Sequence, residues 1–309
     1  MVAQSKYYLE IRTKTRLFNA IRRGLANTLA EELLLSWVKK LVTPDLWSRL
    51  IPPNYLYRKG SFRRIERNGV CYELDLSECV DHGVYFDYLE PAQRRLFQLV
   101  RDRAVIFDVG VNIGSFLLNF AQLSPNGQVF GFEPDVRNFE RAVNNLELND
   151  FSNVTLIRKA LGSAPGTATM LMVNENNAGM NRIRIDESNI PDSKITCEVE
   201  IIRLDDFVES EKLKSLDLIK IDVEGFELNV LKGAQHSLRK FRPILFIELD
   251  DDNLHEQGNS AKELIEFLER EGYGCQRADN GKDLTVNDDF SDCHFDIICE
   301  SIRRPSMYI

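Results

Sequence analysis

The chain has 309 residues, of which 43% are hydrophobic and 28% are charged, and its formal net charge is −9. It is long enough to bury a full core, and no apolar run approaches the roughly 18 residues that a membrane-spanning helix requires. Six cysteines without a C-x-x-C pair and four dispersed histidines argue against a disulfide scaffold and a cysteine–histidine metal site, so we expect free thiols in a reducing compartment.

The N-terminal region differs in charge from the rest of the chain. Residues 1–68 hold 14 Lys/Arg and 5 Asp/Glu, whereas residues 69–309 hold 25 and 43. We therefore divide the chain into a basic extension of helices and short strands over 1–80 and a larger domain over 81–309. The acidity of the second part argues against a nucleic-acid partner, because phosphate backbones need a basic surface.

Within the extension, apolar side chains recur about every four positions over 17–41, which predicts a helix with one apolar face. Basic residues crowd its beginning. Such a helix docks on its own domain or on a second subunit of a homodimer, or it rests on an anionic membrane surface, and the sequence leaves these options open. Because no secretory signal pattern is present, we expect a cytoplasmic protein, with peripheral membrane contact as the alternative.

From residue 54 onward the pattern predicts short alternating elements. Short strands flank the turn Arg67–Gly69, and Glu90–Pro91 opens a helix that ends near Arg101. After residue 104, apolar and amphipathic runs alternate as in a parallel, doubly wound sheet. The predicted order is strand 104–109, helix 115–123, strand 128–133, helix 135–149, strand 154–158, strand 216–222, helix 225–240, strand 243–248, helix 260–271 and an edge strand at 295–299.

The alternation is interrupted between residues 158 and 216. Residues 167–173 and 196–202 alternate like strands, and the polar stretch Asn174–Asn181 lies between them. A long polar insertion near the carboxyl end of a sheet is either a lid over a cleft or a solvated connector. The sequence of 174–195 leaves both interpretations open.

The first strand of the alternation carries Asp108 and runs into a turn with Gly110 and Gly114. Glycine lets the backbone approach a ligand closely, and the turn leads into the N-terminal amides of a helix that begins at Ser115. The next strand ends in Glu133, about 20 residues on, where an acid in such folds holds the ribose of a nucleotide-like cofactor. The alternative for Glu133 is a cap on the following helix. The acids and the turn together predict a cofactor site.

The turn also indicates which cofactor fits. A dinucleotide fingerprint reads G-x-G-x-x-G, and its middle glycine leaves room for a pyrophosphate. Here Asn112 stands in that place and its amide fills the room. This favours S-adenosylmethionine (SAM), which carries no phosphate. Asp108 is placed to accept a hydrogen bond from its ammonium group, and the loop amides are placed to meet its carboxylate.

A second polar cluster lies at the end of the strand 216–222. On a pleated strand Lys220 and Asp222 share a face, and Glu224 joins them if the extended geometry continues. Burying a lysine with two acids is unfavourable unless they pair or meet a ligand, so we assign Asp222 to the chemistry and keep an ion-paired set as the alternative. Glu248 ends the next strand in the same way.

Other acids near this cluster receive simpler assignments. Glu227 is expected only to begin a helix. Asp250, Asp251 and Asp252 follow Glu248, and adjacent acids can hold a divalent ion. Because adjacent acids in a loop are more often solvated, we predict no metal.

In order and spacing, these motifs resemble the FkbM-type SAM-dependent methyltransferases over about residues 80–250. The matching segments are Asp108–Gly114, with Val111 where alanine is usual, Phe132–Pro134, Asn145, Asn149, Lys159–Gly162, Arg203–Asp206 and Ile219–Glu227. The resemblance implies a class I methyltransferase fold, an α/β, Rossmann-like, doubly wound sheet of seven strands whose final strand is antiparallel. It also implies O-methylation of hydroxyls on sugars or polyketide-like products.

The resemblance further implies which residues contact SAM. These are Asp108, Gly110, Asn112 and Gly114 at the methionine end, with Ser115 opening the helix behind them, Glu133 at the ribose, and Lys159 and Ala160 at the adenine edge.

For the chemistry we predict Asp222 as the general base or orienting acceptor and Lys220 as its electrostatic partner, with Glu224 and Glu248 as contacts to substrate hydroxyls. The predicted function is SAM-dependent O-methyl transfer to a sugar, glycolipid or polyketide-like small molecule. Two other classes stay open: a nicotinamide-dependent oxidoreductase, and a non-catalytic membrane or partner adaptor that retains the fold. The intact acids and glycines argue against the adaptor.

Overall fold

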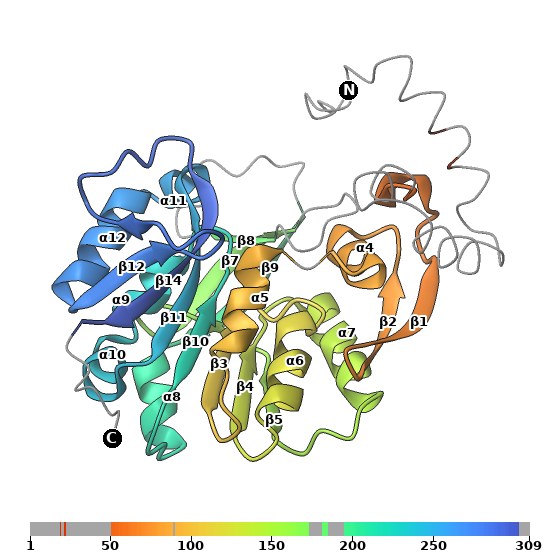
Figure 1. Cartoon of the computed structure of the whole chain (residues 1–309), viewed down its shortest axis with the longest axis horizontal. Coiled ribbons are helices and arrows are strands. Elements are labelled where there is room, and N and C mark those ends of the chain that lie inside the picture. The colour runs from red at the N-terminus through yellow and green to blue at the C-terminus, as the bar shows by residue number, and fades with distance from the viewer. Residues whose placement is uncertain are drawn as a thin grey trace. The chain divides into compact units, whose positions relative to one another are not determined.

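The computed structural model describes Asn19, Arg22 and residues 51–88, 90–172, 181–184 and 195–302 (Figure 1). Apart from Asn19 and Arg22, the helix predicted over 17–41 lies outside these residues, and so do its predicted membrane or subunit contact and most of the insertion over 174–195. The chain divides into two compact units, which are Met1–Ile65 with Glu73–Phe86 and Glu66–Tyr72 with Asp87–Ile309. The predicted boundary at residue 80 stays a prediction.

A predicted hairpin is confirmed before residue 81. The described elements there are η2 (Asn54–Leu56), β1 (Phe62–Arg67), β2 (Val70–Asp75) and α4 (Cys79–Phe86). β1 and β2 form a two-stranded sheet. Asn68 and Gly69 between them have φ of 50° and 79°, the left-handed pair that a two-residue hairpin turn requires.

The second unit is built on an eight-stranded sheet in the order β13-β12-β14-β11-β10-β3-β4-β5. Its strands are β3 (Val105–Val109), β4 (Gln128–Phe132), β5 (Val154–Ile157), β10 (Leu218–Ile221), β11 (Ile244–Asp250), β12 (Tyr273–Arg277), β13 (Asp283–Leu284) and β14 (His294–Ser301). Neighbours from β11 to β5 run parallel, whereas β14 is antiparallel to β11 and to β12. The seven longer strands form the predicted class I methyltransferase sheet with an antiparallel final strand.

Helices cover both faces of this sheet (Figure 1). They are α5 (Pro91–Gln98), α6 (Ser115–Leu123), α7 (Val136–Glu147), α8 (Leu204–Ser210), α9 (Glu227–Lys232), α10 (Gln235–Phe241), α11 (Asp251–Glu256) and α12 (Ala261–Arg270). Successive residues of β3 point to opposite faces. Ile106 belongs to an apolar cluster that includes residues of α5, α6 and α7, and Phe107 belongs to a second cluster that includes residues of α8, α9, α10 and α12. The polar ends of the strands lie between these two apolar layers.

The interruption after β5 is a separate four-stranded sheet in the order β6-β9-β7-β8. Its strands are β6 (Ala160–Leu161), β7 (Gly166–Met172), β8 (Arg182–Arg184) and β9 (Ile195–Ile202). β7 pairs antiparallel with both β8 and β9, so the two strands predicted around the insertion are confirmed. No helix among the described residues is long and apolar enough to cross a bilayer.

Three predicted elements are wrong in detail. The last strand is not at the sheet edge, because β14 lies between β11 and β12 and the edge strand is the short β13. The helix predicted over 225–240 is two helices separated at Gly233, where a Cβ would overlap the backbone oxygen of Gly162. The acids after Glu248 are not in a solvated loop, because Asp250 caps α11 by accepting from the Asn253 amide at 2.8 Å.

Candidate active site

The glycine turn joins β3 to α6 in left-handed backbone conformations. Gly110, Asn112 and Gly114 have φ of 83°, 54° and 90°. A Cβ on Gly110 would overlap the backbone oxygen of Asp222, whereas the nearest atoms to a Cβ on Gly114 lie at 3.7 Å. Gly110 is therefore required by a close approach of two backbones, and Gly114 only by its φ. The turn and the end of β10 are in direct contact through Gly110.

Replacing each glycine by alanine should separate these two requirements. Gly114→Ala is expected to lower the free energy of unfolding by about 1–2 kcal/mol, the cost of a left-handed non-glycine residue. Gly110→Ala should cost more, because it adds an overlap with the Asp222 backbone to a similar strain. Urea unfolding of both variants measures the difference. Equal losses would show that the approach of Gly110 to Asp222 is not tight.

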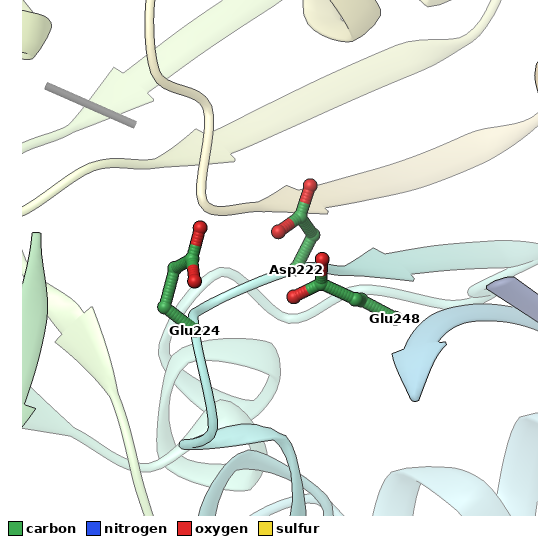
Figure 2. A group of neighbouring side chains, drawn as sticks. All are labelled: Asp222, Glu224 and Glu248. Atoms are coloured by element: carbon green, nitrogen blue, oxygen red, sulfur yellow. The ribbon is translucent and has the colours of Figure 1, made fainter. Parts of the chain in front are cut away.

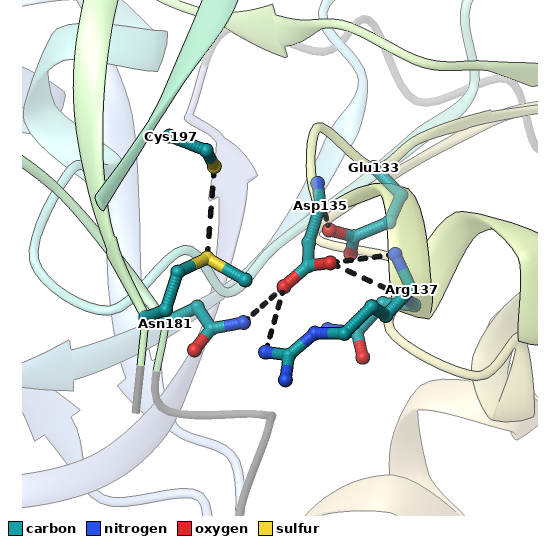
Figure 3. A network of polar contacts seen from close by, with 7 residues as sticks. Glu133, Asp135, Arg137, Asn181 and Cys197 are labelled. Carbon is teal, nitrogen blue, oxygen red and sulfur yellow. Dashed lines mark hydrogen bonds and ion pairs between the residues drawn. The ribbon is translucent and has the colours of Figure 1, made fainter. Parts of the chain in front are cut away.

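Glu133 fastens the turn from the end of β4. Its Oε2 accepts the amide of Asn112 at 2.8 Å and its Oε1 accepts the amide of Asp135 at 2.9 Å. Asp135, rather than Glu133, caps α7 by accepting from the Arg137 amide at 2.7 Å (Figure 3). Burial raises the pKa of Glu133 to about 8, although both amides lower it. The cap that was the alternative role for Glu133 thus belongs to its neighbour.

Lys220 is the centre of a buried ion cluster. Its side chain is 2% exposed, and Nζ lies 3.4 Å from Asp108 Oδ1 and 3.4 Å from Asp222 Oδ2. It also donates to the carbonyl of Gly110 at 2.8 Å. Burial opposes the charge of Lys220, but the two aspartates outweigh it and its pKa is raised. The shared face predicted for Lys220 and Asp222 is confirmed, and Lys220 joins Asp222 to the glycine turn.

Asp108 differs from Asp222 in exposure. The Asp108 side chain is fully buried, whereas that of Asp222 is 39% exposed. No hydrogen bond of ordinary geometry from the described residues reaches either oxygen of Asp108, and burial raises its pKa to about 6 although Lys220 lowers it. Unused acceptor capacity suits an ammonium group, but the oxygens lie beneath the surface. Direct contact between Asp108 and SAM therefore stays a prediction.

Asp222, Glu224 and Glu248 converge at the carboxyl ends of β10 and β11 (Figure 2). One carboxylate oxygen from each lies within 4.8 Å of the others. The extended geometry that was predicted to bring in Glu224 does not continue, because Glu224 has a φ of 54°. A left-handed turn places its carboxylate instead, and Asn253 of α11 donates to Glu224 Oε2 at 2.9 Å. These oxygens are near enough to share one cation, but acidic groups commonly cluster without one, so the absence of a metal stays a prediction.

Burial, together with mutual repulsion, raises the pKa values of Glu248, Glu224 and the nearby Asp296. Burial, then Asp222 and Glu224, raise the pKa of Glu248 far above its usual range, and one of its buried oxygens has no hydrogen bond from the described residues. Burial and Asp222 raise the pKa of Glu224 to about 7. Asp296 of β14 lies opposite Glu248 in the sheet register, and burial raises its pKa to about 7. The raised pKa of Glu248 favours its protonated form, whose carboxyl can then donate a hydrogen bond, and Asp222 is the exposed side chain beside it.

The other residues assigned from the sequence take structural positions. Glu227 accepts the amides of Val223 and Gly225 at 3.0 Å each, so its predicted role at the start of a helix is confirmed. The carbonyl of Ser115 accepts from Asn119 at 2.7 Å. Lys159 pairs with Glu200 at 2.6 Å on the surface, and Ala160 is buried in β6. The adenine contact assigned to Lys159 and Ala160 stays a prediction.

The turn fits SAM better than a dinucleotide. In a phosphate-binding turn the backbone amides point at the ligand, but here the Asn112 amide is donated to Glu133. The neighbouring aspartates, Asp108 and Asp222, would repel a pyrophosphate and attract a sulfonium or an ammonium. Glu133 and the side chain of Asn112 are the predicted holders of the ribose and the methionine end of SAM, and these contacts stay predictions, because the amides of Gly110, Val111, Asn112 and Gly114 are donated within the protein.

The chain is similar in sequence to known proteins. A family model described as "Methyltransferase FkbM domain" matches residues 108–275. The chain is 31% identical to "Methyltransferase 1" of Beauveria bassiana over 43% of this chain and 59% of that one. It is 29% identical to "2-O-methyltransferase NoeI" of Sinorhizobium fredii over 53% and 70%. It is 29% identical to "Hexuronic acid methyltransferase AglP" of Haloferax volcanii over 47% and 56%. The chain thus spans less than two thirds of the first and last of these relatives.

Proposed function

The chain belongs to the FkbM methyltransferase family, and from this premise we propose that it transfers the methyl group of SAM to a hydroxyl oxygen of a sugar, glycolipid or polyketide-like small molecule. SAM is the cofactor of this family. The printed name of one relative specifies a 2-O-methyltransferase, which supports an oxygen acceptor, and that of another specifies a hexuronic acid methyltransferase, which supports a carbohydrate acceptor.

One observation carries the proposal: an exposed carboxylate lies next to the cofactor turn. Asp222 is 39% exposed, its backbone touches Gly110, and Lys220 lies 3.4 Å from its carboxylate. An alcohol has a pKa near that of water, about 15.7, so a base that accepts its proton assists attack on the methyl group. Glu224 and Glu248 stand beside Asp222 as partners for neighbouring hydroxyls of the acceptor.

Four side chains near the glycine turn take different roles in the proposed methyl transfer. When bound, SAM supplies an electrophilic methyl group on a sulfonium. Asp222 accepts the hydroxyl proton, and Lys220 fixes the direction of the Asp222 carboxylate while it donates to the turn. Glu248 in its protonated form donates a hydrogen bond to an oxygen of the acceptor, and Glu224 accepts a hydrogen bond from one of its hydroxyl groups. Because the reaction is an in-line displacement, correct positioning of the oxygen contributes much of the acceleration, up to about 7–11 kcal/mol.

The proposal is tested by incubating the full chain with SAM labelled in the methyl group, in the presence of EDTA, with a panel of hydroxylated glycans, glycolipids and polyketides. We expect label in an ether O-methyl group of at least one compound, identified by NMR, and calorimetric binding of SAM but not of NADH. Turnover that survives EDTA would support the predicted absence of a metal. Absence of SAM binding, or label on nitrogen or in a methyl ester, would contradict the proposal.

A further inference from the structure

A short segment of the insertion is anchored on the cofactor side of the sheet. Asn181, directly before β8, donates through Nδ2 to the buried carboxylate of Asp135 (Figure 3). The backbone of Asp135 in turn donates to Glu133, which holds the amide of Asn112. A continuous chain of hydrogen bonds therefore joins Asn181 to the glycine turn, across the end of β4.

The next two residues are anchored on the other side. Arg182 pairs with Glu256 of α11 at 2.7 Å, and the carbonyl of Ile183 accepts from Gln257 at 2.5 Å. α11 follows β11, whereas Asp135 follows β4. In the sheet order, β10 and β3 lie between β11 and β4. Residues 181–183 therefore form a bridge over the strand ends that carry the glycine turn and Asp222.

Glu224 lies where this bridge and α11 come together. Its left-handed backbone is a conformation that a glutamate adopts only when its surroundings hold it. Asn253 donates to its carboxylate at 2.9 Å. After burial and Asp222, the charge of Arg182 is the largest influence on the pKa of Glu224, and it lowers that pKa, while Asp250 raises it. Asn253 and Glu256 lie one helical turn apart on α11, so the two groups that they bind, the Glu224 carboxylate and the Arg182 guanidinium, lie on the same side of that helix.

Arg182 also retains capacity for this second partner. Its side chain is 18% exposed, and the hydrogen bond to Glu256 uses one of five N–H donors. Glu256 itself is 42% exposed at the rim, where an ion pair adds little stability. The guanidinium of Arg182 is partly buried and is held at one end by Glu256. Its remaining N–H groups are therefore available to orient the carboxylate of Glu224.

We propose that Arg182 is a positioning residue, carried over the site by the bridge Asn181–Ile183, and that it holds the Glu224 carboxylate toward a hydroxyl group of the methyl acceptor. This inference rests on the proposed function, because it assigns Glu224 to acceptor binding. Arg182 acts through Glu224 and takes no part in proton transfer.

The test uses two variants that break the same ion pair. Arg182→Gln removes the pair and the charge beside Glu224, whereas Glu256→Gln removes only the pair, and Arg182→Lys retains the charge. Initial rates are measured on the full chain with SAM and methyl glycosides of neutral hexoses and hexuronic acids, using the glycoside that the wild type methylates fastest. We expect Arg182→Gln to raise KM for that glycoside about 10- to 100-fold. Glu256→Gln should change it less than about fivefold.

The remaining readouts separate positioning from a structural role. KM for SAM should stay near the wild-type value in all three variants, and Arg182→Lys should recover part of the acceptor affinity. An equal rise of KM in Arg182→Gln and Glu256→Gln would overturn the proposal. Arg182 would then act only through its ion pair with Glu256, which holds β8 against α11. An unchanged KM in Arg182→Gln would overturn it as well.

A second measurement does not depend on the acceptor. The urea midpoints of Arg182→Gln, Glu224→Gln and the double variant at pH 8 form a double-mutant cycle. We expect the two single shifts not to add, because each variant removes the same attraction, and additive shifts would overturn the proposal. If the wild type methylates no glycoside, the proposed function fails on this panel, while the cycle still decides whether Arg182 acts on Glu224.

Discussion

Replacement of Asp222 by Asn is expected to lower kcat by about 10²- to 10⁴-fold, the usual contribution of a general base, while the dissociation constant for SAM stays near the wild-type value. The amide keeps the size of the side chain but accepts no proton from the acceptor hydroxyl. It also weakens the contact with Lys220, which still pairs with Asp108 and donates to Gly110. Steady-state kinetics and calorimetry with SAM give the two quantities separately.

Asp217 provides a matched control for this experiment. It lies just before the other end of β10, where Oδ2 accepts the amide of Val105 at 2.9 Å. Asp217→Asn makes the same chemical change on the same strand but far from the glycine turn, so we expect kcat near the wild-type value. If Asp222→Asn retained wild-type turnover with normal SAM affinity, the assignment of the base to Asp222 would be wrong.

Replacement of Lys220 by Met is expected to lower the free energy of unfolding by about 3–5 kcal/mol, because it leaves the charge of Asp108 buried without a partner. The carbonyl of Gly110 also loses its donor. The double variant Lys220→Met/Asp108→Asn removes both charges and should recover a large part of this loss. Chemical unfolding of the two single variants and the double variant at pH 8 measures the coupling. Additive losses would show that the 3.4 Å pair adds nothing to stability.

The pair of Asp108 and Lys220 also makes the stability of the folded protein depend on pH. In the folded protein the pKa of Asp108 is about 6, above the ordinary value of 3.8, because burial outweighs the attraction of Lys220. Between about pH 3.8 and pH 6, Asp108 retains its proton in the folded state but has lost it in the unfolded state. The contribution of Asp108 to the free energy of unfolding therefore falls as the pH rises through this range. Without Lys220 the pKa of Asp108 rises further. The destabilisation by Lys220→Met should therefore be smaller at pH 5 than at pH 8.

Elements with strong local signals were predicted almost to the residue. The helix predicted over 115–123 is α6 (Ser115–Leu123), because a glycine turn precedes it and its apolar positions follow the helical period. Asn68 and Gly69 marked the hairpin in the same local way. The parallel strands from β3 to β11 were recognised because each is short, apolar and ended by a polar residue.

Features that depend on distant contacts were not predictable from the same patterns. The position of β14 between β11 and β12 is a choice of partner, which no local sequence encodes. The break at Gly233 results from contact with Gly162, about 70 residues earlier. α11 has six residues and no apolar repeat, so its N-cap Asp250 and its first two residues, Asp251 and Asp252, resembled a solvated loop.

The candidate site shows the same division. The pairing of Lys220 with Asp222 follows from the two-residue period of a strand. Glu224 was assigned for a different geometric reason from the one that places it, because a left-handed turn takes the role of an extended strand. Asp296 and Arg182 were missed, since they come from an antiparallel partner strand and from the insertion. The only available signal for Asp296 was a single acid within an apolar strand.

The hydrogen bond from Lys220 to the Gly110 carbonyl has a consequence for how such an enzyme diversifies. One ammonium group joins the glycine turn to the end of β10, so a substitution of Lys220 would disturb both at once. Glu224, Glu248 and the strand bearing Arg182 make none of these contacts. If the proposed roles hold, we expect substitutions at these outer positions to change the choice of methyl acceptor and to leave SAM binding intact.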